Sequence, residues 1–598
     1  MLAAGLLLWF LLPHALGGHG FPLGPDAPVY LWWTRLAGVD GLSAVGHRPG
    51  VPAISLALEG TLGLTGVEVI AALEGALGVC VGLASAALVR AADARRATWV
   101  TAGVLAGTFS VHLAAGYLAN LAFAVAFLGA AGALAAGTRR GAVAAAFLLG
   151  AGGLAHSLFF LLGAITLSLS AALAWRSERA EAVRVGAATL GGGALLGVGL
   201  LALLAGPGPL EVDTSKDGFL RRAGLVDELR SAYLDRFVQR WARYVEWASV
   251  PLAIAGLRDA GGFLGRFLRA WGLVTIVGVG VALASGLAPA DRFVTFGFVV
   301  PILAAFGLVR LWDALASRRI LAVAAAGALG VAMLAGAWIA WDRQEPFISG
   351  LEARRVSDAA LWIDAAGPGT TLVFPVNADD PEVTFLATRA GNVIRAGVPA
   401  DRIRDVVVVV PAPASDETPS PVRAALSRVT LGDANAATAA SGGRHLDVLL
   451  APFDRVDVAG ANIPGSRWTR VSTGVFLSDA GAGDGPGRPP ALRPSSPGGI
   501  TWSTIALLAT ASIVGYGWAR AALRRPVQAA ALAPAFGAAA LTIVAIALER
   551  LGLTLTGGNL SGSVISAVAA GGGYVAWLVL ERRARTRPTP QVEQQPEQ

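Results

Sequence analysis

Residues 2–35 read LAAGLLLWFLLPHALGGHGFPLGPDAPVYLWWTR, and the two parts of this stretch differ sharply in character. The first part, 2–17, is apolar and approaches the roughly 20 residues that a bilayer-spanning helix needs. It lacks a basic segment in front and many apolar runs follow it, so we interpret it as a retained helix and not a cleaved signal peptide. The second part places Asp26 between Pro25 and Pro28. The sequence therefore predicts a chain that leaves the bilayer and at once presents a carboxylate on a loop stiffened by prolines.

The composition assigns the chain to the membrane-protein class. Its 598 residues are 55% hydrophobic and only 15% charged, and the mean hydropathy is +0.61. A water-soluble fold has no means of hiding that much apolar surface, so the bilayer is the expected solvent. The net charge of +7 does not indicate a nucleic-acid partner, because the arginines lie in short clusters between apolar runs. The single cysteine, Cys80, excludes an intramolecular disulfide and a thiolate metal cluster.

Apolar runs of spanning length recur along the chain, and we predict a multi-pass α-helical membrane protein with about fourteen transmembrane helices. The expected spans are 2–17, 65–89, 98–113, 117–137, 141–155, 157–175, 184–205, 244–257, 268–287, 293–310, 319–341, 501–520, 528–548 and 560–580.

The arginine clusters orient these spans. Most of them fall on one side, at 95–96, 139–140, 176–184, 258–269, 310–319 and 520–525 and in the C-terminal tail. The positive-inside rule then places both termini in the cytoplasm, and we expect the plasma membrane as the location. We expect three parts. A transmembrane part at 1–341 carries the outer loops 18–64 and 206–243, and an extracytoplasmic α/β domain with its linker follows at 342–499. The last part, 500–598, holds C-terminal transmembrane helices and a cytoplasmic tail.

The extracytoplasmic segment alternates between two kinds of pattern. Short buried strands are predicted at 370–376, 405–410, 445–453 and 474–479, and amphipathic helices at 356–366, 380–391 and 420–429. This alternation indicates a small α/β layer with a mainly parallel sheet. No glycine-rich phosphate loop follows a strand, so we expect no nucleotide site there. The stretch 480–499 has the composition of a flexible linker.

Polar and aromatic side chains gather at the predicted outer face, and polar groups beside membrane spans are candidates for function. The candidate site residues are Asp26, Tyr30, Trp32, Trp33, Arg48, Glu68, His112, Tyr117, His156 and Arg292. Simpler interpretations stand beside this one. The histidines are equally explained as residues solvated by lipid headgroups, the two tryptophans as an aromatic belt, and Glu68 and Glu74 as paired groups inside the bundle.

Four stretches resemble the GT-C superfamily of membrane glycosyltransferases, which includes oligosaccharyltransferases and protein mannosyltransferases. They are PDAPVYLWW (25–33), VHLAAGYLANL (111–121), GLAHSLFFLL (153–162) and PADRFVTFGFVVPILAAFGL (289–308). The WWDYG-type motif of oligosaccharyltransferases has its nearest counterpart in GSRWTRV (465–471), which lacks the acidic residue and the tyrosine. Peptide glycosylation is therefore not what the resemblance implies.

The resemblance implies transfer of a sugar from a polyprenyl-phosphate carrier to a glycan, lipid or protein acceptor on the extracytoplasmic face. Asp26 would act as the base, and Arg292 and Arg48 would bind the lipid phosphate. Tyr30, Trp32 and Trp33 would offer a platform for the sugar. The remaining candidates would line the substrate site: Glu68, His112, Tyr117 and His156. Carboxylates and histidines also suit a divalent cation such as Mg²⁺ or Mn²⁺, but no ligand spacing is defined, so the cofactor stays open.

Two other classes of protein remain compatible with the sequence. A transporter or flippase of lipid-linked glycans would also carry polar groups in its spans, although no internal repeat is evident and the charges gather at one face. A non-catalytic membrane assembly subunit with the same fold is the second alternative. The identities of the sugar, the acceptor and any partner subunit are not encoded in a recognisable motif.

Overall fold

The computed structural model describes residues 1–24, 26–46, 48–114, 116–204, 248–285, 290–347, 493–553 and 559–585, together with five strands and isolated residues between these ranges. Several expected features lie outside the described residues. They are Pro25, most of the loop 206–243, most of the three predicted helices of the extracytoplasmic segment, and most of the linker 480–499.

Each of the fourteen expected spans coincides with a helix or with two consecutive helices. The helices are α1 (Leu2–Gly17), α4 (Gly66–Ala92), α5 (Arg96–Phe109), α6 (Val111–Ala114), α7 (Leu118–Ala135), α8 (Arg139–Ala155), α9 (Ser157–Ala174), α10 (Arg179–Leu204), α13 (Ser249–Gly256), α14 (Gly262–Ser285), α15 (Ala290–Phe296), α16 (Val299–Ala314), α17 (Arg319–Asp342), α21 (Pro497–Ala522), α22 (Pro526–Arg550) and α23 (Asn559–Arg585). Among the described residues, ten helices are long and apolar enough to cross a membrane. The α1, α8, α13 and α16 helices fall short of that length. The prediction of a multi-pass helical membrane protein is confirmed.

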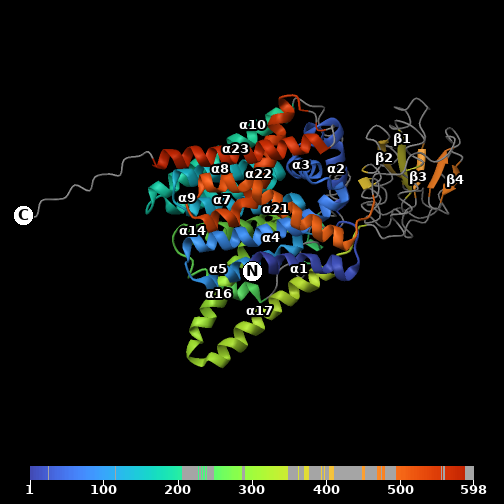
Figure 1. Cartoon of the computed structure of the whole chain (residues 1–598). Coiled ribbons are helices and arrows are strands. Elements are labelled where there is room, and N and C mark those ends of the chain that lie inside the picture. The colour runs from blue at the N-terminus through green and yellow to red at the C-terminus, as the bar shows by residue number, and fades with distance from the viewer. Residues whose placement is uncertain are drawn as a thin grey trace, which may run out of the picture.

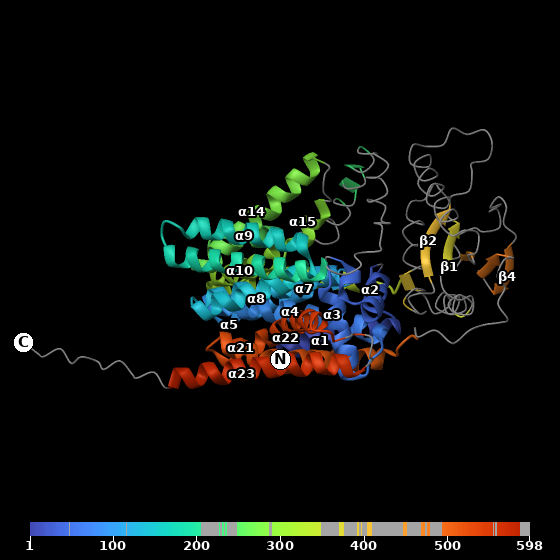
Figure 2. The same ribbon diagram turned by 90° about the horizontal axis from the view of Figure 1, so that it is seen from above.

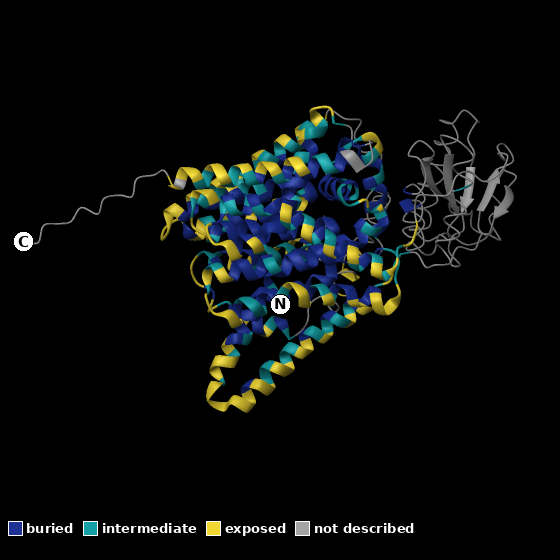
Figure 3. Cartoon of the chain, in the orientation of Figure 1, coloured by how far each residue is buried: buried dark blue, intermediate teal, exposed yellow. Residues whose placement is uncertain are grey.

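Burial divides the bundle into a packed interior and a lipid-facing exterior (Figure 3). Helices α4 and α7 are buried over almost their whole length, whereas most residues of α10, α17 and α23 are not buried in the bundle. Leu190, Ile320 and Val575 are examples of large apolar side chains left exposed, as expected of residues that face hydrocarbon. Small residues bring α21 and α22 into contact, because a Cβ on Gly515 or Gly537 would collide with the facing backbone.

The expected loop at 18–64 is largely helical, which corrects the sequence-based interpretation. It contains α2 (Ala27–Asp40), a short 3₁₀ helix η1 (Leu42–Val45) and α3 (Gly50–Leu62). Pro28 stands in the first turn of α2, where its fixed φ suits a helix and its missing N–H costs no hydrogen bond. The aromatic run therefore forms a helix that packs on the bundle, and Tyr30 and Trp32 are buried in it.

Five strands form one sheet beyond the end of the bundle that carries α2 (Figures 1 and 2). They are β1 (Thr370–Pro375), β2 (Ile403–Val409), β3 (Asp447–Leu450), β4 (Trp468–Ser472) and β5 (Val475–Ser478), in the order β2-β1-β3-β5-β4. The four predicted strands are present, but β4 was not expected.

The sheet is mixed and not mainly parallel. The β1 strand pairs in parallel with β2 and β3, while β5 runs antiparallel to both β3 and β4. The short connection between Ser472 and Val475 accounts for the difference, because a tight hairpin joins antiparallel strands only. Expected and observed strands agree best at β1, which was predicted at 370–376 and ends one residue earlier, at Pro375.

Candidate functional site

Asp26 lies at the contact between the start of α2 and the turn that precedes α7. It occupies the capping position of α2 and is half-buried. The facing residue is Gly116, whose φ of +105° is a conformation that glycine adopts readily. A Cβ at Gly116 would lie 2.9 Å from the Asp26 nitrogen and 3.2 Å from its Cβ. Glycine therefore allows this close approach, which brings the first outer segment against the turn between the third and fourth expected spans.

Tyr30, one turn further along α2, connects Asp26 to two arginines. The buried Tyr30 hydroxyl accepts a hydrogen bond of 3.1 Å from the backbone N–H of Ala119, in the first turn of α7. Burial, with the negative charge of Asp26 adding to it, raises the pKa of Tyr30 to about 12, and the nearby charges of Arg48 and Arg292 act in the opposite direction. The phenol therefore stays neutral at physiological pH, and all three charged groups lie close enough to influence it.

Arg292 reaches the same place from a distant part of the sequence. It belongs to α15, and its guanidinium carbon lies 5.7 Å from the centre of the Tyr117 ring, just before α7. A guanidinium over an aromatic face is held in place while its N–H groups remain directed outward. We call Asp26, Tyr30, Arg48, Tyr117 and Arg292 the Asp26 cluster. These five predicted site residues are brought together from four separate stretches of the chain.

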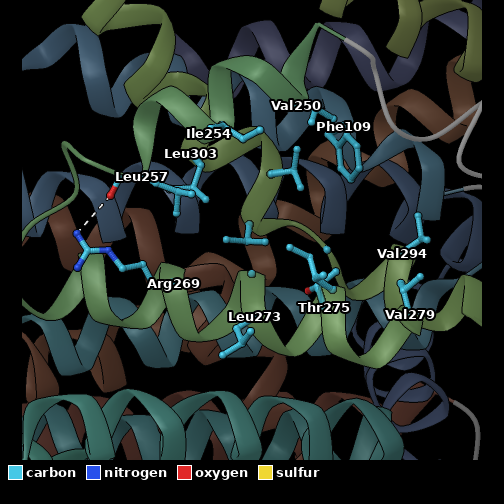
Figure 4. A pocket seen from close by; sticks show the side chains of 16 residues that line it. Phe109, Val250, Ile254, Leu257, Arg269, Leu273, Thr275, Val279, Val294 and Leu303 are labelled. Carbon is cyan, nitrogen blue, oxygen red and sulfur yellow. Dashed lines mark hydrogen bonds between the residues drawn. The ribbon is translucent and has the colours of Figure 1, made fainter. Parts of the chain in front are cut away.

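An apolar groove of about 590 Å³ runs from α15 along α14 and α16 (Figure 4). Val294 of α15 lies at one end of the groove and Arg269 of α14 at the other, where Arg269 donates a hydrogen bond to the carbonyl of Leu257. Between them the walls are almost wholly apolar, with Phe109, Leu273 and Leu303 among the lining residues. Val294, at one end of the groove, is two residues from Arg292 in α15, but Arg292 is not one of the residues that line the groove.

The two predicted histidines are buried and not solvated at an interface. His112 is 4% exposed and its ring meets the edge of Phe109 at 5.0 Å, so it stands behind the wall of the groove. His156 is 1% exposed; its Nδ1 accepts a hydrogen bond from the Phe159 N–H, and its ring stacks on Phe159. His156 thus caps α9, and Gly50 at the start of α3 packs against the neighbouring Ala155.

Glu68 has structural contacts through both of its carboxylate oxygens. Oε2 accepts hydrogen bonds from the backbone and hydroxyl of Thr65 in a capping box at the start of α4. Oε1 accepts a 3.1 Å hydrogen bond from Ser495, where the chain returns to the membrane before α21. A part in substrate binding for Glu68 stays a prediction.

Glu74 is paired inside the bundle, but with a partner that the sequence did not single out. Its Oε2 lies 3.5 Å from Nε2 of His14, and both side chains are almost completely buried. The sequence offered one sign of this pair, because His14 stands directly after Pro13 within the first apolar run.

The two predicted tryptophans differ in burial. Trp32 is buried, at 5% exposure, whereas Trp33 is partly exposed and meets the Tyr30 ring edge-on at 5.7 Å.

No group of three histidine, cysteine, aspartate or glutamate side chains with metal-binding geometry occurs among the residues that the structure describes. His47 and the side chain of Asp291 lie outside that set.

Comparison with known proteins finds similarity to solved structures. The sequence matches no family model and no curated protein. The crystal structure of ArnT from Cupriavidus metallidurans in the apo state is similar to this chain, with a TM-score of 0.44 and 13% sequence identity; the match covers 80% of this chain and 96% of that chain. At so low a TM-score no residue role passes from one chain to the other, and the roles of the residues in this chain rest on their own contacts.

Proposed function

We propose that the chain is a membrane glycosyltransferase that moves a sugar from a polyprenyl-phosphate carrier to an acceptor hydroxyl at the outer membrane face. The observation that carries the proposal is the proximity of Asp26, Arg48 and Arg292 to Tyr30, together with an apolar groove that reaches α15, the helix of Arg292. A base, a pair of phosphate-binding cations and a lipid-compatible groove are the parts that such a reaction needs. The motifs that resemble the GT-C superfamily supply three of these residues: Asp26, Tyr30 and Arg292.

The proposed reaction is a single displacement at the sugar. Asp26 accepts the proton of the acceptor hydroxyl while the acceptor oxygen bonds to the anomeric carbon. The bond between that carbon and the phosphate oxygen breaks, and polyprenyl phosphate leaves with its electrons. Arg292, held over Tyr117, and Arg48 neutralise the negative charge that develops on the leaving phosphate.

The groove gives the carrier a place to lie. One end of the groove lies at Val294 in α15, so a phosphate bound at Arg292 of the same helix would leave the isoprenoid chain along α14 and α16. The nearly apolar lining suits a hydrocarbon occupant and offers little to a free sugar or a soluble ion. This feature favours a lipid-linked donor over a transported polar solute.

The test is transfer of labelled sugar from synthetic polyprenyl-phosphate donors to a lipid or glycan fraction by the purified chain. Asp26→Asn keeps the size of the side chain but accepts no proton, so it should lower the rate by roughly 10²–10⁴-fold. Asp40→Asn, at the exposed end of the same helix, is the matched control and should leave the rate unchanged. Equal rates for Asp26→Asn and the parent chain would remove Asp26 as the base. If every donor stays intact, a transporter or a non-catalytic subunit becomes the better proposal.

The orientation that we propose has both termini in the cytoplasm of a cell bounded by the plasma membrane, with the sheet outside. The position of the C-terminus of α23 supports this orientation. The last turn of this helix carries Arg582, Arg583 and Arg585 and lies on the side of the bundle away from the sheet (Figure 1). Arginine-rich ends belong on the cytoplasmic side.

A further inference from the structure

Two adjacent cavities lie where the arginine-rich ends of α8, α21 and α22 meet, with α23 beside them. The first, which we call the apolar slot, has a volume of about 350 Å³ and is lined by Val143, Phe147, Trp518, Phe536 and Ala576 among others. The rings of Phe147 and Trp518 stack at 5.5 Å and form one wall. Arg139 and Arg140, at the start of α8, also line the slot.

The second cavity, the polar pocket, has a volume of about 250 Å³ and is lined by Thr138, Arg524, Arg525 and Gln528. It shares Ala522 with the apolar slot, so the two cavities adjoin at the end of α21. One cavity is polar and its neighbour is apolar. None of these residues belongs to the Asp26 cluster.

Four exposed arginines surround these cavities. Arg139, Arg140, Arg524 and Arg525 have no carboxylate within ion-pair distance among the residues that the structure describes. Some arginines in other connections between spans do have acidic partners. Arg95 lies 2.7 Å from Asp313, Arg266 lies 2.7 Å from Glu181, and Arg310 lies 3.5 Å from Asp259. The charge around the two cavities is therefore left available to an anion from outside the chain.

We propose that the apolar slot and the polar pocket bind an anionic phospholipid of the adjoining leaflet. Guanidinium groups match the oxygens of a phosphodiester with paired hydrogen bonds, and Arg524 and Arg525 present them at the polar pocket. An acyl chain fits the slot beside the wall that the stacked rings of Phe147 and Trp518 form. Basic pockets between membrane helices on the cytoplasmic side bind acidic headgroups by this combination. The positive-inside rule alone explains the arginines but not a cavity between them.

The first test titrates the purified full-length chain in detergent with phosphatidylglycerol and measures bound lipid by native mass spectrometry. Phosphatidylethanolamine with the same acyl chains is the lipid control. The variant carries Arg139→Gln, Arg140→Gln, Arg524→Gln and Arg525→Gln together. We expect phosphatidylglycerol to bind the parent chain more tightly than phosphatidylethanolamine, and the variant to lose about tenfold or more of that affinity. Equal binding of the two lipids by the parent chain would overturn the proposal.

Two exposed arginines at another connection between spans provide a matched protein control. Arg318→Gln with Arg319→Gln removes charge between α16 and α17 and touches neither cavity. It should keep the affinity for phosphatidylglycerol within about twofold, since surface charge outside a site has a small effect. The same loss in this control and in the cavity variant would mean that lipid binds by general surface charge, and the proposed site would be wrong.

A second pair of variants tests the acyl-chain slot without changing any charge. Ala576→Phe places a ring in the slot, whereas Val575→Phe adds a ring at the next residue of α23, which is exposed and does not line it. Ala576→Phe should weaken phosphatidylglycerol binding severalfold, and Val575→Phe should not. Unchanged affinity in Ala576→Phe would remove the slot from the site, even if the arginine variant proved too unstable to assay.

Discussion

Glu549, near the end of α22, accepts a hydrogen bond of 2.9 Å from the backbone N–H of Leu42, in the turn that follows α2. The two residues are 507 positions apart in the sequence. Gly41, immediately before Leu42, has a φ of +88°, and a Cβ there would lie 2.8 Å from Glu549 Oε1. The C-terminal helices therefore hold the outer segment that positions Tyr30 and Asp26.

Removing that acceptor should loosen the outer segment. Glu549→Ala leaves the Leu42 N–H without its charged acceptor, so we expect the free energy of unfolding to fall by about 1–3 kcal/mol. Glu549→Gln keeps an acceptor oxygen and should restore most of the loss. Glu581→Ala, which removes an ion pair on the exposed surface of α23, is the control and should cost little. Denaturation in detergent is the measurement, and equal stabilities of the alanine and glutamine variants at position 549 would contradict the expected role.

Gly116 offers a test of the contact with Asp26. Gly116→Ala combines an unfavourable positive φ with a Cβ placed against the Asp26 backbone. Gly137→Ala shares the positive φ, at +68°, but its Cβ would meet nothing within 4 Å. We expect Gly137→Ala to cost about 1 kcal/mol of stability without affecting sugar transfer. Gly116→Ala should in addition reduce transfer, because it displaces Asp26; equal transfer rates in the two variants would show that the contact does not matter for the site.

Arg292 should bind the lipid phosphate through the geometry of its guanidinium group. Arg292→Lys keeps the charge but loses the paired hydrogen bonds, so the affinity for polyprenyl phosphate should fall by about tenfold. Arg318→Lys makes the same exchange at an exposed residue that does not line the groove and should leave the affinity unchanged. Binding is measured by ligand-induced thermal stabilisation of the folded protein. An Arg292→Lys variant that binds as tightly as the parent chain would place the phosphate elsewhere.

Glu59 should make the stability of the protein depend on pH. Burial raises the pKa of this carboxyl group, in α3 outside the expected spans, to about 8, although the charge of Arg35 acts in the opposite direction. Because the pKa is higher in the folded than in the unfolded state, the protonated Glu59 carboxyl group favours the folded state. Its contribution to the free energy of unfolding is fully present below about pH 4.5 and is lost as pH rises toward 8. The loss should be at most ~1.4 kcal/mol per pH unit. Thermal unfolding between these limits is the measurement, and Glu59→Gln should flatten the profile; an unchanged slope in that variant would assign the effect to other groups.

Reporter fusions test the proposed orientation. A reporter that is active only outside the cytoplasm should be active when fused after Ser478, at the end of β5, and inactive after Arg140 or Arg585. The reverse pattern would invert the orientation of the whole bundle and place the Asp26 cluster on the cytoplasmic side.

The sequence by itself determined where the chain crosses the membrane. Hydropathy and length are local properties, so every expected span coincides with a helix, and valine-rich stretches such as 405–410 became strands. Arg292 could also be predicted as a site residue, because an arginine at the outer mouth of a span is on the wrong side to anchor it. Asp26 followed from its position directly after the first span.

The tertiary structure decided which of these residues meet. Asp26 packs against Gly116, Glu74 pairs with His14, and Glu549 reaches Leu42, and none of these contacts leaves a pattern in the local sequence. The helix α2 was also missed, because its aromatic residues are stabilised by burial against the bundle, where α2 packs on α3 and α4, and not by a strong helical propensity of their own. Local hydropathy measures the preference of a segment for lipid over water, whereas contacts between distant segments depend on how the helices pack, which only the assembled bundle determines.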